Sequence, residues 1–271
     1  MLGYFDLILW PLLATFVLTG IHVYLGLHVV SRGVIFVDLA LAQVAALGTA
    51  IGILIGLGHD SVPTYLIALG FTFIGALLFA ITRSKNGKVP QEAIIGITYV
   101  VAAAMMIVLF SKSPKGAEHL NHLLVGSILF VTPKIVGVTF VLYTIIGLFH
   151  WFFRKKFFEA SKQYNNRELQ HTKIWDFLFY ITFGFVVTSS VKIAGVLLVF
   201  SFLIIPAVTA LLFVNGNTKR LVFGWVFGIL GSILGMLVSV IFDIPTGASI
   251  VVTFGGMLSV LGIVKQIKSK N

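Results

Sequence analysis

The sequence contains no cysteine, which excludes disulfides, iron–sulfur clusters and thiolate metal ligands. Charged residues are scarce as well, at 10% of the 271 residues, against about 25% in soluble domains. A soluble domain could not cover its surface with so few charges, whereas a lipid bilayer accepts this composition. The mean hydropathy of +1.06 agrees. We therefore expect an integral membrane protein.

Several motifs of catalytic and nucleotide-binding proteins are also missing. The chain has no GxxxxGK[ST] phosphate loop, no HExxH, no GxSxG and no pair of aspartates inside its apolar stretches, which disfavours a membrane-embedded enzyme. The net charge is +10, but the basic residues lie at the ends of apolar stretches and form no patch with interleaved aromatics. Nucleic-acid binding is therefore not expected, and the basic residues are typical of cytoplasmic loops.

The apolar stretches predict an all-α, polytopic bundle of about nine transmembrane helices, each near the ~20 residues that cross a bilayer. Residues 1–271 are expected to form a single transmembrane domain. The first stretch is expected to be a retained helix, because no basic region of a signal peptide precedes it. Lys192 and Gly195 alone separate the sixth stretch from the seventh. The expected spans are 7–30, 36–57, 63–82, 91–111, 132–153, 174–192, 195–214, 220–242 and 248–265.

The basic residues predict the orientation of these spans. Alternate connectors are rich in lysine and arginine, and nine spans place all of these connectors on one face, which the positive-inside rule makes cytoplasmic. In this multi-pass protein of the cell membrane, the N-terminus then lies outside the cell and the C-terminus in the cytoplasm. Eight spans would break the alternation of basic and non-basic connectors. The basic set comprises Arg32, Arg83, Lys85, Lys88, Arg154, Lys155, Lys156, Lys162, Arg167, Lys173, Lys219, Arg220, Lys265, Lys268 and Lys270.

Small residues recur at helical spacing in the second and eighth spans. The second has glycine every fourth residue from Gly48 to Gly56, and the eighth has Gly224 and Gly228 followed by Gly231 and Gly235. Such stripes let helix backbones approach closely in lipid. We expect them to serve bundle packing, with the second span as a central helix.

Five segments, in order along nearly the whole chain, resemble one family. They are GLHVVSRGVIFVDLALAQVAALG (26–48), QEAIIGITY (91–99), HLLVGSIL (122–129), VKIAGVLLVFSFLIIPAVTALL (191–212) and FDIPTGASIVV (242–252). Together they are similar to the permeases of ATP-binding-cassette importers for zinc, manganese and iron.

The resemblance implies partners and a mechanism. It implies a homodimer of permease subunits in membrane lipid, two ATPase subunits on the cytosolic face and an external metal-binding protein that delivers the ion. The transported zinc, manganese or iron is cargo, ATP is held by the partner, and this chain is expected to hold no cofactor of its own and to catalyse no reaction. Because the chain lacks a phosphate loop, ATP-driven transport requires a separate ATPase chain.

The first family block departs from the usual pattern at its metal-binding pair. That pattern has an Asp and, four residues later, a His, whereas this sequence has Leu39 and Gln43 there and an aspartate one residue earlier, at Asp38. Asp38 is rotated about 100° from the expected helix face. Asp38 and Gln43 remain metal candidates, since a carboxylate inside a span suggests function. The alternative is that Asp38 faces its helix N-terminus or pairs with Arg32.

Histidines supply the other metal candidates. If GAEHLNHLL is helical, Glu118, His119 and His122 lie on neighbouring positions of one face, and an oxygen with two imidazoles suits zinc, manganese or ferrous iron. The alternative is a solvated external loop. His22, deep in the first span, is either a ligand or a buried histidine that is hydrogen-bonded across helices.

The remaining histidines are expected near water. His28 lies close to Arg32 and is expected to extend toward the cytosolic edge of the membrane. His150 and His171 flank the basic loop and are expected to be exposed, and His59 with Asp60 is expected to form a turn.

The loop over 154–173 is the longest cytosolic connector, and its position in the family implies a short coupling helix that contacts the ATPase. The loop lacks the family's glycine, so binding of lipid head groups is the alternative. The candidate ATPase contacts are Phe157, Phe158, Glu159, Arg167 and Glu168.

Three residues that interrupt helices are candidates for the pathway or its hinges. Pro206 has no N–H to donate, which frees a backbone carbonyl near Phe202. Pro206 is therefore either a hinge of the pathway or a static kink. Gly195 and Pro245 are grouped with Pro206 because they stand beside span ends in the two segments most typical of the family.

A secondary, ion-coupled carrier is the competing function. Such a carrier needs a coupling-ion site inside its spans, and Asp38 is the one carboxylate placed securely within a span. No internal repeat with paired broken helices, common in such carriers, is visible. We therefore favour the ATP-driven permease.

Overall fold

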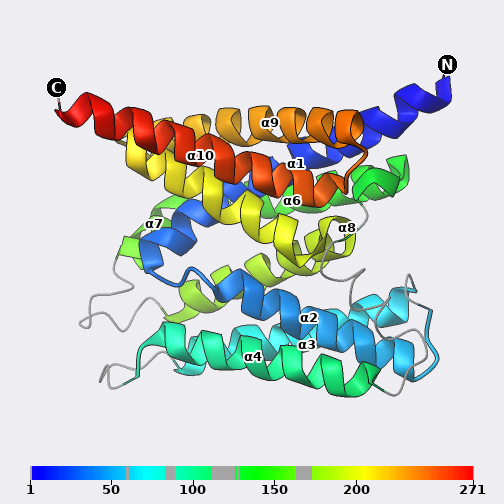
Figure 1. Ribbon diagram of the computed structural model, residues 1–271. Helices are drawn as coiled ribbons and strands as arrows, with labels where there is room; N and C mark the ends of the chain where they lie inside the picture. The colour runs from blue at the N-terminus through cyan, green and yellow to red at the C-terminus, as the bar shows by residue number, and fades with distance from the viewer. Residues whose placement is uncertain are drawn as a thin grey trace. The chain divides into compact units, whose positions relative to one another are not determined.

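The computed structural model describes residues 2–58, 61–82, 89–111, 126, 128–162 and 173–270, and within these ranges it contains helices and no strand (Figure 1). The chain contains long runs of Leu, Ile, Val, Ala and Phe. In lipid no water is available to hydrogen-bond to the backbone N–H and C=O groups of such runs, so these groups bond to one another within a helix. The elements are α1 (Leu2–Arg32), α2 (Val37–Leu54), α3 (Val62–Thr82), α4 (Gln91–Phe110), η1 (Ile128–Phe130), α6 (Pro133–Phe152), α7 (Arg154–Lys162), α8 (Lys173–Phe213), α9 (Asn217–Phe242) and α10 (Thr246–Lys270).

Eight helices of the described chain are long and apolar enough to cross a membrane, which confirms a polytopic helical bundle. The apolar part of α8 runs for 40 residues, from Ile174 to Phe213, or about 60 Å at the helical rise. That is twice the hydrocarbon thickness of ~30 Å. Gly195, with φ 75° and ψ 163°, breaks α8 where the sequence predicts the junction of two spans. Counting the two arms of α8 separately gives the nine helical segments expected from the sequence.

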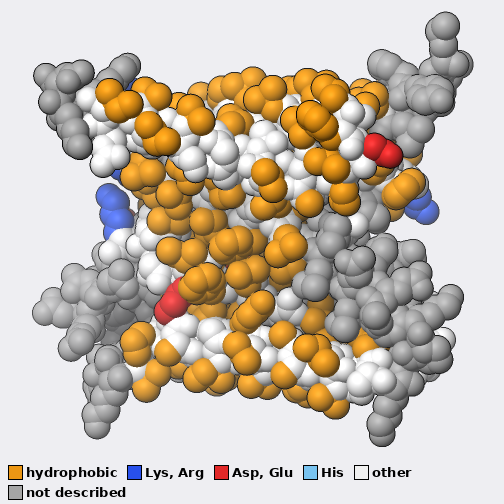
Figure 2. All heavy atoms as spheres, in the orientation of Figure 1, with side chains coloured by type: hydrophobic (Ala, Val, Ile, Leu, Met, Phe, Trp, Pro, Cys, Tyr) orange, Lys and Arg blue, Asp and Glu red, His pale blue; other side chains and the backbone are white. Residues whose placement is uncertain are grey.

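The exposed surface is apolar, as expected for a bilayer-facing protein. Hydrophobic side chains cover most of the described face in Figure 2, and its few charged side chains lie toward the edges. On α9 and α10, Ile241 and Val252 are 71% and 74% exposed. Large apolar side chains so open to the surroundings are stable in lipid and not in water.

The chain divides into two compact units. The terminal unit comprises Met1–Leu27, Val125–Val141 and Ile193–Asn271, and the central unit comprises His28–Leu124 and Leu142–Lys192. The single domain expected over 1–271 stays a prediction. Each unit is described by itself below.

In the central unit, α2 packs closely on α3 through its glycines. A Cβ added at Gly48 would lie 2.8 Å from the Ala68 Cα, and one at Gly52 would lie 3.0 Å from the Thr64 Cγ2. Both distances are shorter than normal contacts, so only glycine permits this approach. The predicted packing role of these two glycines is confirmed, whereas Gly56 has φ 87° and no neighbour within 4 Å.

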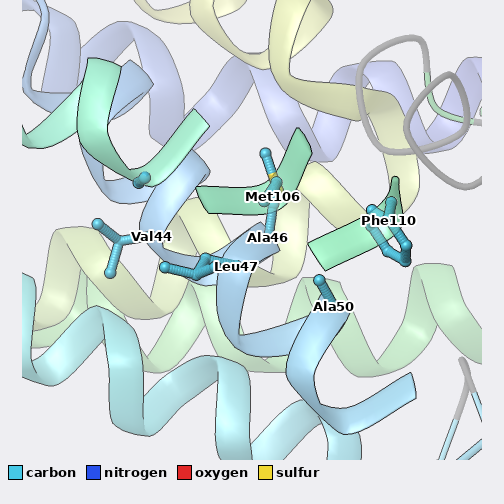
Figure 3. Close-up of a cluster of buried hydrophobic side chains, with 7 residues drawn as sticks. Val44, Ala46, Leu47, Ala50, Met106 and Phe110 are labelled. Carbon is cyan, nitrogen blue, oxygen red and sulfur yellow. The ribbon is translucent and has the colours of Figure 1, made fainter. Parts of the chain in front are cut away.

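The other side of α2 packs on α4. Alanines of α2 meet larger side chains of α4 in the cluster of Figure 3, and this pairing of small with large residues fills the interface. The cluster comprises Val44, Ala46, Leu47, Ala50, Ala102, Met106 and Phe110. Helix α2 therefore lies between α3 and α4, as a central helix of this unit.

In the terminal unit, α9 uses its glycines on two partners. A Cβ at Gly228 would lie 2.6 Å from the Thr19 Cγ2 of α1, and one at Gly235 would lie 2.6 Å from the Ile250 Cα of α10. The Ser249 hydroxyl of α10 donates to the Gly235 carbonyl at 2.7 Å and reinforces the second contact. The two glycine pairs of α9 thus face different helices.

Candidate functional site

Asp38 and Gln43 both lie in α2, and both are buried. They are 1% and 2% exposed. The Asp38 carboxylate stands in the first turn of α2 and accepts the Leu39 backbone N–H at 2.7 Å. The Gln43 Oε1 has no hydrogen-bond donor among the residues that the structure describes. A carboxylate and an uncommitted amide oxygen are oxygen donors of the kind that manganese accepts.

The expected alternative pairing of Asp38 with Arg32 does not occur. Arg32 Nη1 lies 2.9 Å from Asp176 Oδ1, and both side chains are fully buried. Asp38 has no ion pair with any residue in the described ranges. Its place at the N-terminal end of α2 is the part of the alternative that the structure retains, since a helix dipole favours a negative charge there.

His22 is fully buried in α1, and its ring is fixed by a hydrogen bond within the helix. Its Nδ1 lies 2.7 Å from the Leu18 carbonyl oxygen, so Nδ1 carries the hydrogen and donates. In the neutral ring, Nε2 then holds the lone pair, as in most metal-bound histidines. The Phe202 ring is 6.5 Å away, centroid to centroid. The sequence-based alternative expected a hydrogen bond from His22 to another helix, whereas this bond stays within α1.

No group of three or more metal-binding side chains is assembled within the described ranges. The predicted external site cannot be compared with this finding, because Glu118, His119 and His122 lie outside the described residues. Asp38, Gln43 and His22 are therefore the metal candidates that the structure places.

A buried polar cluster in the central unit was missed by the sequence analysis. The Arg32–Asp176 pair joins α1 to the first arm of α8, and Arg32 Nε also donates to the Ser161 Oγ of α7 at 3.0 Å. The His28 Nδ1 lies 2.8 Å from the same Ser161 Oγ. The guanidinium carbon of Arg32 lies 4.0 Å from the Phe179 ring centroid. The sequence offered one signal for the cluster: opposite charges on Arg32 and Asp176, near the ends of two spans.

Two histidine predictions were wrong. His28 and His150 are each 1% exposed, because each has a hydrogen-bonding hydroxyl inside the protein. His28 meets Ser161, and His150 Nε2 lies 2.8 Å from the Thr182 Oγ1. A paired imidazole loses little on leaving water, so neither ring needs to reach the membrane edge. The other histidine predictions concern His59, Asp60 and His171, which lie outside the described ranges.

Helix α7 provides the short helix that the family resemblance implies for the 154–173 loop. Its inner side is buried: Phe157 is fully buried and stacks on His150 at 4.0 Å, while Phe158 lies 4.7 Å from His28, centroid to centroid. Glu159 is exposed on the outer side. Arg167 and Glu168, the other candidate contacts, lie outside the described ranges.

The candidate hinge residues occupy three different settings. Pro206 lies inside α8 and packs on α9, where its Cγ would be 3.6 Å from a Cβ at Gly228. Gly195 is the break in α8. Pro245 is exposed in the α9–α10 connector, and its carbonyl accepts the Ser249 N–H at 3.0 Å, which starts α10.

Two family-like segments meet at the break in α8. Gly126, from the HLLVGSIL segment, has φ 71°, and an added Cβ would overlap the backbone of Ala194 and Gly195. Only glycine combines this conformation with so close an approach. The two motifs therefore share one structural contact.

The QEA segment at the start of α4 also has a structural role. The Gln91 Nε2 donates to the Phe79 carbonyl near the end of α3 at 2.9 Å. The Glu92 Oε1 accepts the Phe36 backbone N–H at 3.1 Å, just before α2. The segment thus ties α4 to the ends of its two neighbours.

Comparisons with known proteins agree with this architecture. The chain is 30% identical over 235 residues to the manganese transport system membrane protein MntC of Halalkalibacterium halodurans, covering 81% of this chain and 77% of the relative. It is 26% identical over 234 residues to the manganese import system permease protein ScaB of Streptococcus parasanguinis, covering 84% and 80%.

A solved structure shares the fold. PsaBC from Streptococcus pneumoniae in complex with Fab matches with a TM-score of 0.77 at 24% identity, over 96% of this chain and 92% of that chain. The model of the ABC 3 transport family matches residues 4–265. This chain is therefore a multi-pass plasma-membrane protein and a membrane permease that belongs to the ABC 3 transport family.

Proposed function

We propose that this chain is the permease of an ATP-driven importer for a divalent transition metal, with manganese as the ion carried. The match to the ABC 3 family over residues 4–265 carries the proposal. Relatives named for manganese transport, matched over more than three quarters of their own length, favour manganese over zinc or iron.

The energy source is a separate ATPase. The chain has no phosphate loop of its own, so a partner must bind and hydrolyse ATP. Two copies of the permease with two ATPase subunits and an external metal-delivery protein form the proposed importer. The N-terminus lies outside and the C-terminus in the cytoplasm.

Helix α7 is the proposed ATPase contact. Its outer side is exposed and highly charged, while its inner side is buried against α6 and α8. The exposed charged residues are Arg154, Lys155, Lys156, Glu159 and Lys162. Phe157 supports this surface from within and does not itself reach the ATPase.

In the central unit, Asp38 and Gln43 of α2 are the proposed contacts of the passing ion. Asp38 supplies a carboxylate and Gln43 an amide oxygen that lacks a described donor, and both are oxygen donors of the kind that suits manganese. In the terminal unit, His22 of α1 is a separate proposed contact through its imidazole. The group of Glu118, His119 and His122 remains a proposed external contact.

Uptake into proteoliposomes tests the proposal. Vesicles carry the permease with its ATPase, the delivery protein is added outside, and manganese, zinc and iron(II) are offered separately. We expect manganese uptake only with ATP inside the vesicle and with the ATPase present. Uptake by the permease alone without ATP would favour the ion-coupled carrier, and ATP-dependent uptake of zinc alone would reject manganese.

A further inference from the structure

The buried side of α7 carries one serine, Ser161, which lies at a junction of three elements. Ser161 accepts a hydrogen bond from Arg32 Nε at 3.0 Å and lies 2.8 Å from His28 Nδ1, both on α1. Arg32 in turn pairs with Asp176 in the first turn of α8 at 2.9 Å. Through these bonds α7, α1 and α8 are joined side chain to side chain.

The junction is buried, which makes its geometry well defined. Arg32 and Ser161 are 1% and 2% exposed and Asp176 is fully buried. Water does not compete for these bonds, so they are stronger than surface pairs and less screened by salt. The guanidinium also lies on the Phe179 ring at 4.0 Å, which restrains its plane.

The two sides of α7 have different partners. Phe157, Ala160 and Ser161 form its buried side, at the i, i+3 and i+4 spacing of one helix face. The charged side is exposed. A force applied to the exposed side therefore reaches the rest of the chain through the buried side, where Ser161 supplies the directional bonds and the aromatic contacts are less oriented.

The far ends of the junction lie beside functional elements. Arg32 is the last residue of α1, and a connector of four residues, 33–36, leads to α2, which carries Asp38 and Gln43. Asp176 lies in the first turn of the arm of α8 that runs to the break at Gly195. Movement of α7 through Ser161 would thus be passed to the start of α2 and to α8.

We infer that Ser161, Arg32 and Asp176 form a coupling junction, which transmits the ATP-driven displacement of α7 to the transport helices. The inference rests on the proposed function, in which α7 contacts the ATPase. The three are positioning residues, because they act through α7, α2 and α8 and touch neither ATP nor the transported ion.

The test measures manganese(II) uptake and ATP hydrolysis in the same proteoliposomes containing the permease–ATPase complex and the delivery protein. We compare Ser161→Ala with Ser232→Ala, a buried serine whose hydroxyl donates to its own helix at the Gly228 carbonyl. We expect Ser161→Ala to lower manganese carried per ATP hydrolysed roughly tenfold, the lower end of the scale of a lost hydrogen bond to a charged group. Ser232→Ala should leave this ratio unchanged.

A cross-link separates failure of this inference from failure of the proposed function. The natural chain lacks cysteine, so Lys155→Cys on the exposed side of α7 can be joined specifically to the ATPase. The cross-link should form in the parent and in Ser161→Ala. If it forms in both and the ratio is unchanged, the coupling junction is overturned while the ATPase contact stands. If the parent does not cross-link, both are overturned.

A second variant enters the junction from α8. Asp176→Asn keeps the shape of the side chain and removes the charge that pairs with Arg32. All rates are normalised to assembled complex, so a loss of folded protein does not mimic uncoupling. Since both substitutions break one junction, the double variant should lose no more coupling than the worse single variant. Additive losses would assign the two residues to independent roles and overturn the inference.

Discussion

The buried carboxylate of Asp38 lowers the stability of the folded chain, so its presence indicates a functional requirement. It is 1% exposed, lacks an ion pair with any described residue and accepts one backbone N–H from Leu39. Burying a charge with so little compensation is costly. Residues that reduce stability in this way are commonly retained for activity.

Replacing Asp38 by Asn should therefore separate transport from stability. We expect manganese uptake to fall about tenfold or more, a loss of at least ~1.4 kcal/mol of transport free energy. The thermal unfolding midpoint in detergent should stay the same or rise, because a neutral amide is cheaper to bury. Thr49→Ala, on the same helix, is the control, since the Thr49 hydroxyl donates to its own helix at the Ala45 carbonyl. A lowered midpoint with normal uptake would make Asp38 a structural residue.

Gly126 occupies a position where the backbone conformation and the close packing leave no room for a side chain. Gly126→Ala should lower the free energy of unfolding by about 2 kcal/mol or more, because the new Cβ overlaps the Ala194 backbone and φ is 71°. Thermal unfolding of the purified protein measures this. Gly147→Ala, where nothing lies within 4 Å, should be neutral or slightly stabilising. Equal midpoints for the two variants would contradict the close approach.

At the residue scale, the sequence predicted the helices that carry Asp38, Gln43 and His22 but not the partners of these side chains. Asp38 and Gln43 lie in α2, as the apolar pattern indicated. His28 and His150 were misplaced because their partners are distant in sequence: Ser161 is 133 residues from His28. Hydropathy treats a histidine as polar wherever it stands, and only the fold brings a hydroxyl to it.

At the scale of the helices, small-residue spacing was the most informative signal. The glycine stripe of α2 and the two glycine pairs of α9 predicted close helix packing. The structure assigns the first of these contacts to α3 and the others to α1 and α10. Spacing gives the helix face but not the partner helix. That choice depends on which side chains of other helices complement the stripe.

The α9–α10 contact should be sensitive to one methyl group. Gly235→Ala would place a Cβ 2.6 Å from the Ile250 Cα, and we expect a loss of about 2 kcal/mol or more. Gly255→Ala, on α10 with nothing within 4 Å, should instead gain up to ~1 kcal/mol from helix propensity. Thermal unfolding in detergent compares the two. Opposite signs are expected, and two losses of equal size would argue against close packing at Gly235.

Helix α7 shows how far element-level reasoning reaches. The family resemblance implied a short helix in the longest basic connector, and Phe157, Ala160 and Ser161 follow the spacing of a buried face. The sequence analysis grouped Phe157 with the ATPase contacts. An aromatic on an amphipathic helix can face either its own protein or a partner, and periodicity does not separate the two.

At the scale of the whole molecule, composition alone predicted a multi-pass helical protein. The division into two compact units was not visible, because two of its four boundaries fall inside the helices α1 and α6, while a third lies in α8 close to Gly195. A boundary within a continuous helix leaves no change of composition or linker. The break in α8 was visible, since Gly195 follows closely on the isolated charge of Lys192.

The orientation of the whole chain can be tested at three exposed positions in the natural cysteine-free background. Lys155 lies on α7, Lys219 at the start of α9 and Asp243 at its end. The positive-inside rule predicts that Lys155→Cys and Lys219→Cys react with a membrane-impermeant maleimide only from the cytoplasmic side. Asp243→Cys should react only from outside, because one span, α9, separates it from Lys219. Labelling of intact cells and of inside-out vesicles measures both directions.

The same three positions decide whether α8 crosses the membrane once or twice. Helix α8 is the one membrane-spanning helix of the described chain between Lys155 and Lys219. If its two arms each cross, with the chain reversing at Gly195, both lysine positions lie on one side. If α8 crosses once, they label from opposite sides. Arms of about 20 residues each match a bilayer, whereas one helix of about 60 Å does not, so we expect labelling from the same side and nine crossings in all.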